Sequence, residues 1–332
     1  MKKKIILLAP LHFSIYKMLI QNLEYLGFEV FFLHVDVDFK YQSSKDRIVN
    51  FLRKVFLGDK NYKKITLVER YYSKMLIPKL TNFTENHFDY ALYIRSDIYP
   101  IDIIKRTSFL AKKSVAYQWD GINRYPEIFK RIELFDKFYV FEQEDYKKLK
   151  PKHQNLYLTH NFYPNIEEKT TDILKSDVYY IGTYIPDRFD DFINLYKKLS
   201  VFDLNFNILI ASSNPKIISK YQNDDIKFLS KPIMYNENLS LLRGAKIVLD
   251  IKVTDHSGLS FRFFEAIKHR VKIITDNVSV KKYDFYHPNN IFILKHDSYE
   301  NLKGFIESEY LEIDETIYEK YSFKSWISDI LN

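Results

Sequence analysis

The chain has 332 residues, of which 46% are hydrophobic, enough to build substantial cores, so global disorder is excluded. At about 150 residues per domain, this length predicts two domains. The sequence has no cysteine, which excludes disulfides, thiolate metal sites and a cysteine nucleophile and fits a reducing, cytoplasmic compartment. Its net charge of +7 points only weakly to a polyanionic partner.

The first half of the sequence alternates between apolar runs and amphipathic segments. We expect strands over 3–9, 28–35, 88–94, 114–118 and 137–141, and helices over 14–26, 46–56, 68–83, 101–111, 127–134 and 143–149. This alternation predicts an α/β domain on a doubly wound parallel sheet, whose sites lie at the carboxyl ends of the strands. The loop after the first strand lacks a G-x-G-x-x-G pattern, so no dinucleotide-binding motif is present.

A polar stretch over 161–177, with Pro164 and a charged run, predicts a linker. A second α/β series follows, with strands expected over 178–181, 205–211, 226–229, 247–251, 271–275 and 290–294, and helices over 186–199, 214–221, 236–244, 261–269 and 298–310. We therefore expect an N-terminal domain over 1–160, a second domain over 178–317 and a C-terminal helix over 318–332.

The segment 247–277 is the strongest candidate site. A helix over 261–269 follows the turn Ser257-Gly258 and lies between two expected strands. The free N–H groups and positive end of such a helix can hold a phosphate. Arg262 can bind phosphate oxygens with two parallel hydrogen bonds, and Glu265, one turn later, can accept hydrogen bonds from two ribose hydroxyls. The alternative is an exposed Arg–Glu pair on an ordinary amphipathic helix.

Several short motifs in the second half occur in a recognisable order. They are the segments 178–183, 257–265, 272–277 and 283–291, together with Arg188. In this order they resemble bacterial glycosyltransferases of the two-domain GT-B class, particularly those of lipopolysaccharide-core and capsule synthesis, including the core rhamnosyltransferase-like group. The resemblance is specific over about 178–294 and only topological before that.

This resemblance implies two Rossmann-like domains facing a cleft, with the glycan acceptor on the first domain and a nucleotide-sugar donor on the second. In the wider class, two glutamates eight residues apart bind the nucleotide-sugar. The second matches Glu265, whereas Ser257 stands at the place of the first. The implied donor-binding residues are Gly182, Thr183, Arg188, His256, Ser257, Gly258, Leu259, Ser260, Arg262 and Glu265.

Glycosyl transfer needs the charge of the leaving phosphate stabilised and the acceptor hydroxyl oriented or deprotonated. If the arginines and the helix start stabilise the charge of the leaving phosphate, the reaction requires no metal. It then requires no cofactor beyond the nucleotide-sugar donor, which is a substrate. A base would then come from the N-terminal domain. Candidates at expected strand ends are His12, Asp97 and Asp120. Each has an alternative role, a local hydrogen bond for the histidine and helix capping for the two aspartates.

Two other functions remain open from the sequence. One is a nucleotide-sugar epimerase-like enzyme with the same fold, and the other is a non-catalytic, basic polyanion-binding protein. No nucleic-acid recognition stretch is visible. No segment approaches the ~18 apolar residues that span a bilayer. The basic stretches 60–64 and 147–152 are candidates for peripheral contact with the anionic inner face of the cell membrane, or are ordinary solvated surfaces.

Overall fold

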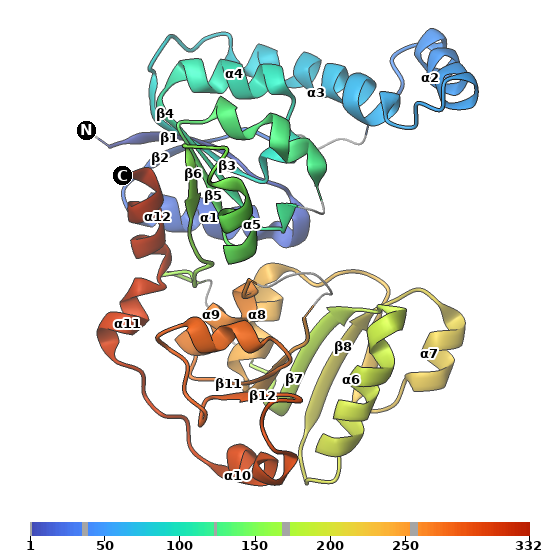
Figure 1. Cartoon of the computed structure of the whole chain (residues 1–332), viewed down its shortest axis with the longest axis vertical. Helices are drawn as coiled ribbons and strands as arrows, with labels where there is room; N and C mark the ends of the chain where they lie inside the picture. The colour runs from blue at the N-terminus through green and yellow to red at the C-terminus, as the bar shows by residue number, and fades with distance from the viewer. Residues whose placement is uncertain (1, 35–38, 123–124, 168–172, 253–257) are drawn as a thin grey trace. The chain divides into compact units, whose positions relative to one another are not determined.

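The chain folds into two compact units, which we describe separately. The structure, a computed structural model, describes residues 2–34, 39–122, 125–167, 173–252 and 258–332. Unit 1 comprises Met1–His12, Tyr16–Thr159 and Ile327–Asn332, and unit 2 comprises Phe13–Ile15 and His160–Trp326. In Figure 1, helices lie on both faces of the sheet in each unit.

Unit 1 is built on a parallel sheet in which the described residues form six strands, in the order β2-β1-β3-β4-β5-β6. Their bounds are β1 (Lys4–Leu8), β2 (Glu29–Phe32), β3 (Phe88–Ile94), β4 (Ala111–Gln118), β5 (Lys137–Val140) and β6 (Leu156–Leu158). The inner strands are buried apolar runs, as expected where helices cover both faces. The chain changes its direction of travel across the sheet between β1 and β3, and doubly wound sheets bind their ligands at such a switch point.

The helices of this part of the chain are α1 (Ile15–Tyr25), α2 (Ser44–Phe56), α3 (Glu69–Leu76), α4 (Ile101–Leu110) and α5 (Gln143–Leu149). Shorter turns are η1 (His12–Ser14), η2 (Lys63–Val68), η3 (Ile77–Leu80), η4 (Ser96–Ile98), η6 (Pro126–Lys130) and η7 (Ile132–Leu134). The turn after α1 contains Gly27 with φ 89°, a left-handed conformation that glycine adopts without steric cost.

Unit 2 repeats this architecture, with six described strands in the order β12-β11-β10-β7-β8-β9. They are β7 (Ser176–Thr183), β8 (Phe206–Ala211), β9 (Ile226–Leu229), β10 (Ala245–Asp250), β11 (Lys272–Thr275) and β12 (Ile291–Ile293). Numbered from β7, this is the order 6-5-4-1-2-3 of a doubly wound Rossmann-like sheet, and its switch point lies between β7 and β10.

The helices of this part are α6 (Pro186–Leu199), α7 (Pro215–Tyr221), α8 (Tyr235–Arg243), α9 (Phe261–Lys268), α10 (Leu302–Glu307), α11 (Glu315–Lys320) and α12 (Phe323–Leu331), with turns η8 (Val278–Lys282) and η9 (Tyr299–Asn301). Successive residues of β10 point to opposite faces of the sheet. Val248 therefore joins the core that contains Phe263 of α9, whereas Leu249 joins the core that contains Phe192 of α6.

The α/β fold class with two doubly wound sheets and a C-terminal helix is confirmed. Several element predictions need correction. The strand β6 (Leu156–Leu158) was not expected from the sequence. The segment 127–134, expected to be one helix, forms the two turns η6 and η7. The segment 318–331 is divided between α11 and α12, because Phe323 donates its backbone N–H to the carbonyl of Tyr163 (2.8 Å) and Tyr163 donates to Tyr321 (3.0 Å). These hydrogen bonds interrupt the helical pattern.

Among the described residues, no helix is long and apolar enough to cross a bilayer.

Candidate functional site

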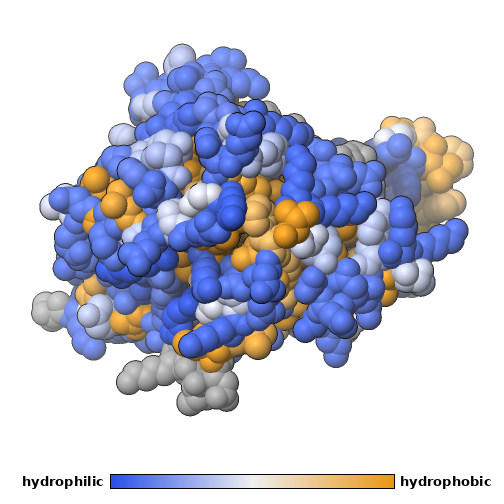
Figure 2. All heavy atoms as spheres, turned by 90° about the horizontal axis from the view of Figure 1, so that it is seen from below, coloured by the Kyte–Doolittle hydropathy of each residue, from blue (hydrophilic) through white to orange (hydrophobic). Residues whose placement is uncertain are grey.

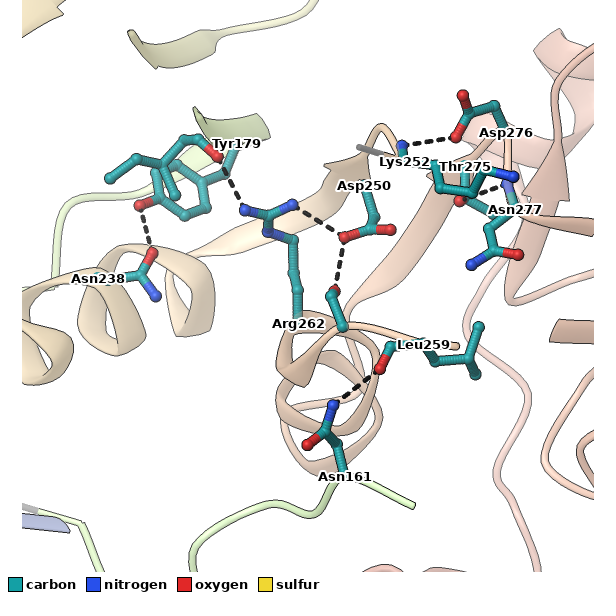
Figure 3. Close-up of polar contacts among 12 residues, drawn as sticks. Asn161, Tyr179, Asn238, Asp250, Lys252, Leu259, Arg262, Thr275, Asp276 and Asn277 are labelled. Carbon is teal, nitrogen blue, oxygen red and sulfur yellow. Dashed lines mark hydrogen bonds and ion pairs between the residues drawn. The ribbon is translucent and has the colours of Figure 1, made fainter. Parts of the chain in front are cut away.

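Arg262 connects the two strands that border the switch point of unit 2 (Figure 3). Its Nη1 donates to Asp250 at the end of β10 (2.9 Å), and its Nη2 donates to the backbone carbonyl of Ile181 in β7 (2.8 Å). The Asp250 carboxylate also accepts a hydrogen bond from the Ser260 hydroxyl (2.7 Å). Burial is the largest single influence on the pKa of Arg262 and lowers it. The Asp250 carboxylate and the smaller effects of Tyr180, Tyr179 and Glu265 together outweigh burial, so the net pKa lies above its usual value.

The start of α9 is left without a side-chain cap. Ser260 occupies the N-cap position with extended backbone angles, and within the described residues no side chain makes a capping hydrogen bond there. These amides therefore keep the partial positive charge of a helix N-terminus. Two amide side chains bind the described residues just before the helix, since Asn161 donates to the carbonyl of Leu259 (2.9 Å) and Asn277 to that of Gly258 (3.1 Å).

Glu265, one turn into α9, is buried and incompletely paired. Its side chain is 2% exposed, and Oε1 has no hydrogen-bond partner within the described residues. Burial raises the pKa of Glu265 to about 7, against the opposing effects of Tyr235 and Arg262. The alternative of an exposed Arg–Glu surface pair is therefore wrong, because the glutamate does not reach the surface.

Arg188 in α6 supplies a second unpaired group on this edge. Its Nη1 is buried and makes no hydrogen bond to any part of the chain that the structure describes. It lies close enough to Asp276 to lower the pKa of that carboxyl, which burial, and to a smaller degree Asp250, raise above its usual value. A buried guanidinium nitrogen without an acceptor is costly, and a phosphate oxygen is the acceptor that it fits best.

The remaining donor-site predictions fall around this edge or outside the described residues. Gly182 lies near the end of β7, where a Cβ would collide with the ring of Tyr180. Thr183 is the exposed last residue of the same strand. His256 and Ser257 lie outside the described residues.

In unit 1, the two predicted acids lie together because one arginine binds both. Arg95 donates from Nε and Nη2 to Asp97 (3.0 and 2.7 Å), and its Nη1 lies 2.9 Å from Asp120. Its guanidinium carbon is 3.9 Å from the centre of the Tyr125 ring, a cation–π contact. Arg95 has φ 62°, a conformation uncommon for a residue with a side chain and often found at functional sites.

The third predicted base, His12, follows β1 in the turn η1 and is exposed. Because β1 and β3 pair directly, the loops that carry His12 and Asp97 leave from the two strands that border the switch point of unit 1. Tyr99 ties these strand ends together, since its hydroxyl donates to the carbonyl of Ala9 (3.0 Å). The three acid–base candidates predicted from the sequence therefore follow strands that end at one edge of the unit 1 sheet.

No protein-family model matches the chain, and no curated protein matches it in sequence. Solved structures match it in fold at low identity. An alpha-glucosyltransferase in complex with UDP-glucose and DNA containing an abasic site has a TM-score of 0.52 and 12% identity over 99% of this chain and 95% of that one. The lipopolysaccharide outer core galactosyltransferase WaaB, in its apo form, has a TM-score of 0.52 and 13% identity over 98% and 97%.

The N-terminal domain of a trehalose-6-phosphate phosphatase from Candida albicans has a TM-score of 0.56 and 13% identity over 100% of this chain and 97% of that one. The chain has the GT-B fold.

Within this fold, sequence reasoning missed Arg95, Asp250 and Asp276. Arg95 had a signal, because it directly follows an expected strand and precedes Asp97 by two residues. Asp250 ends an apolar run, and such a buried acid requires a cationic partner.

Proposed function

We propose that the chain is a metal-independent glycosyltransferase that moves a sugar from a nucleotide-sugar to a hydroxyl group of a glycan acceptor. The observation that carries the proposal is a pair of incompletely satisfied, buried polar groups on the carboxyl edge of unit 2, Nη1 of Arg188 and Oε1 of Glu265. One is a cation suited to phosphate and the other an acceptor suited to hydroxyl groups. A nucleoside diphosphate presents both kinds of partner.

In this proposal, the diphosphate lies against the uncapped start of α9 and Arg188, with Gly258, Leu259 and Ser260 supplying the loop. The guanidinium of Arg262 already donates to Asp250 and Ile181. We therefore assign Arg262 a supporting role, in which it holds the strand ends together and adds positive charge near the phosphates. Glu265 accepts hydrogen bonds from the ribose hydroxyls. The residues Gly182, Thr183, His256 and Ser257 complete the proposed donor site.

The reaction breaks the bond between the sugar's anomeric carbon and the phosphate oxygen, and forms a bond from that carbon to the acceptor oxygen. The leaving phosphate keeps the bonding electrons, which is why positive groups at the donor site promote the step. The acceptor hydroxyl loses its proton to a base. The candidates for this role remain Asp120, Asp97 and His12. The side chains of Arg95, Asp97, Asp120 and Tyr125 in unit 1, which we call the Arg95 cluster, have the polar groups to bind sugar hydroxyls.

We further propose that the acceptor belongs to lipopolysaccharide, capsule or a similar surface glycan, and that the transferred sugar is a hexose or deoxyhexose. The sequence resemblance over about 178–294 supports this choice, and the shared fold with an outer core galactosyltransferase is consistent with it. An acceptor of this kind, linked to lipid, would require the enzyme to work at a membrane surface.

The first test is a thermal-shift screen of the full chain against UDP, GDP, TDP and CMP, followed by calorimetry on the best nucleotide. We expect one of them to raise the melting temperature, and the shift to be lost in Arg188→Ala. Lys197→Ala is the matched control, because Lys197 is an exposed cation near the end of the same helix. If no nucleotide stabilises the chain, the proposal is wrong.

A further inference from the structure

Helix α2 (Ser44–Phe56) has an apolar face that the described protein does not cover. No residue of this helix is buried. Phe51 is 61% exposed and Phe56 is 74% exposed. The exposed large apolar side chains of the helix are at positions 48, 51, 52, 55 and 56, a spacing that places them on one stripe of an α-helix. Such a stripe normally packs into a core, and its exposure therefore requires an explanation.

The orientation of α2 follows from its polar contacts. Asn50 donates to the hydroxyl of Tyr41 (3.0 Å), and Arg70 of α3 donates to Asp46 (3.4 Å). Both contacts use the polar side of the helix, which turns the apolar stripe away from Tyr41 and α3. In Figure 1 the helix projects beyond the end of α3, and the orange patch at the right edge of Figure 2 is this apolar face.

The residues around this stripe carry most of the protein's net positive charge. Residues 40–64 contain eight Lys or Arg and two Asp, a net charge of +6 out of +7 for the chain. The other 307 residues are thus almost neutral. At 100° per residue, Arg47 and Lys54 lie on one side of the apolar stripe and Arg53 on the other. Within the described residues, Arg53 forms an ion pair with Asp59 (3.3 Å), whereas Arg47 and Lys54 form none.

We propose that α2 and the basic residues around it form a docking surface for an anionic lipid bilayer. A helix with apolar side chains on one face and cations along its borders lies in the plane of a membrane, with the apolar face among the acyl chains and the cations at the headgroups. A second copy of this chain is the less suitable occupant, because two surfaces of charge +6 would repel each other.

The other basic stretch, 147–152, lacks these features. Lys147 forms an ion pair with Glu144 (3.1 Å), and Lys150 donates to the backbone carbonyls of Gln154 and Leu156 (2.8 and 2.9 Å). Its apolar residue, Leu149, is buried. The structure thus separates the two stretches that the sequence treated alike, and only 60–64 adjoins an exposed apolar face.

The biological purpose of this surface rests on the proposed function, because a membrane-bound enzyme meets a lipid-linked acceptor in two dimensions. Its physical existence does not depend on glycosyl transfer. The experiment therefore uses the full chain with vesicles alone, without donor or acceptor. Failure of vesicle binding would refute the docking surface and leave the nucleotide-binding proposal intact. Failure of nucleotide binding would likewise refute the proposed function and leave the docking surface intact.

The test is flotation with phosphatidylcholine vesicles that contain 0, about 20 or about 40% phosphatidylglycerol, at low and at physiological salt. Binding should increase with anionic lipid and weaken with salt, since screening acts on the headgroup attraction. Phe51→Ser/Phe56→Ser should lower the partition coefficient by about a hundredfold, and Lys45→Ala/Lys54→Ala by about twentyfold. Val201→Ser is the matched control, because Val201 is an exposed apolar residue at the end of α6, and it should bind as the wild type does.

Three results would overturn the proposal. The first is absence of binding at low salt to the most anionic vesicles. The second is unchanged binding by the Phe51/Phe56 variant, which would mean that attraction is purely electrostatic and that α2 does not insert. The third is a dimer in light scattering that the same variant dissociates while vesicle binding is absent, which would make the stripe a contact between protein molecules. A blue-shifted emission of Phe56→Trp on vesicles, relative to the unsubstituted chain, would support insertion directly.

Discussion

Replacing Glu265 by Gln should make the stability of the protein less dependent on pH, because the buried carboxyl is costly only when ionised. Burial raises its pKa to about 7 from the usual value of 4.5 for a glutamate. At 1.36 kcal/mol per pH unit, this difference corresponds to about 3 kcal/mol. Because the folded pKa is raised, the stabilising contribution of the protonated form is fully present below pH 4.5 and is lost as the pH rises through 7. Glutamine resembles the protonated form at every pH.

The measurement is urea unfolding of the wild type and Glu265→Gln at pH 5, 6, 7 and 8. The two proteins should be similarly stable at pH 5, and the variant should gain up to about 3 kcal/mol on the wild type by pH 8. Glu300→Gln, at an exposed glutamate, should show no such trend. A difference between wild type and Glu265→Gln that stays constant from pH 5 to 8 would refute the reasoning.

The same carboxyl connects stability with ligand binding. If ribose hydroxyls bind the ionised form of Glu265, nucleotide binding will release protons between about pH 5 and 7, and affinity will rise with pH. Calorimetry in two buffers of different ionisation enthalpy measures that release, which should vanish in Glu265→Gln. If the wild type shows the expected pH-dependent stability but binds nucleotide without proton release, Glu265 is a structural acid and does not hold the ribose.

Four further outcomes are expected. Arg188→Ala should weaken nucleotide binding by about tenfold to a hundredfold in calorimetry with little loss of stability, because Nη1 forms no hydrogen bond that would be lost. Arg262→Ala should destabilise the protein by about 3–5 kcal/mol in urea unfolding, since it leaves Asp250 buried without the cation that pairs with it, and adding Asp250→Asn should restore much of that loss. Arg95→Ala should lower the turnover number while leaving nucleotide affinity unchanged. Transfer activity should persist in EDTA, whereas activity that returns only with added divalent cation would contradict metal independence.

Strands and helices could be predicted well where burial imposes a period on the sequence. The runs 247–251 and 271–275 predicted β10 and β11, because a strand covered on both faces is apolar throughout. The ion pair between Arg262 and Asp250 could not be predicted in this way. It joins a strand end to a helix across an intervening loop, and its formation depends on how that loop folds. From spacing, Arg262 was expected to bind phosphate, with an exposed Arg262–Glu265 pair as the alternative, and neither interpretation included Asp250.

The apolar stripe of α2 shows a different limit of the sequence. Periodicity predicted the helix, but the same pattern is found whether the apolar face packs into a core or meets a membrane. The discriminating information lies in the polar residues, because Asn50 and Asp46 attach the opposite side of the helix to unit 1. The sequence therefore predicted the helix correctly, but only the structure shows that its apolar face is exposed.

The Arg95 cluster shows how strand register can unite residues that the sequence keeps apart. Asp97 and Asp120 appeared as independent candidates, since 23 positions separate them. Ile94 of β3 lies beside Tyr117 of β4, so the segments that leave these two strands begin at neighbouring points on one edge of the sheet. An arginine at the first of these positions can bind acids from both loops. Since the two carboxylates share one guanidinium, removal of either acid leaves the other paired with Arg95, and their contributions to acceptor binding or catalysis will not be additive.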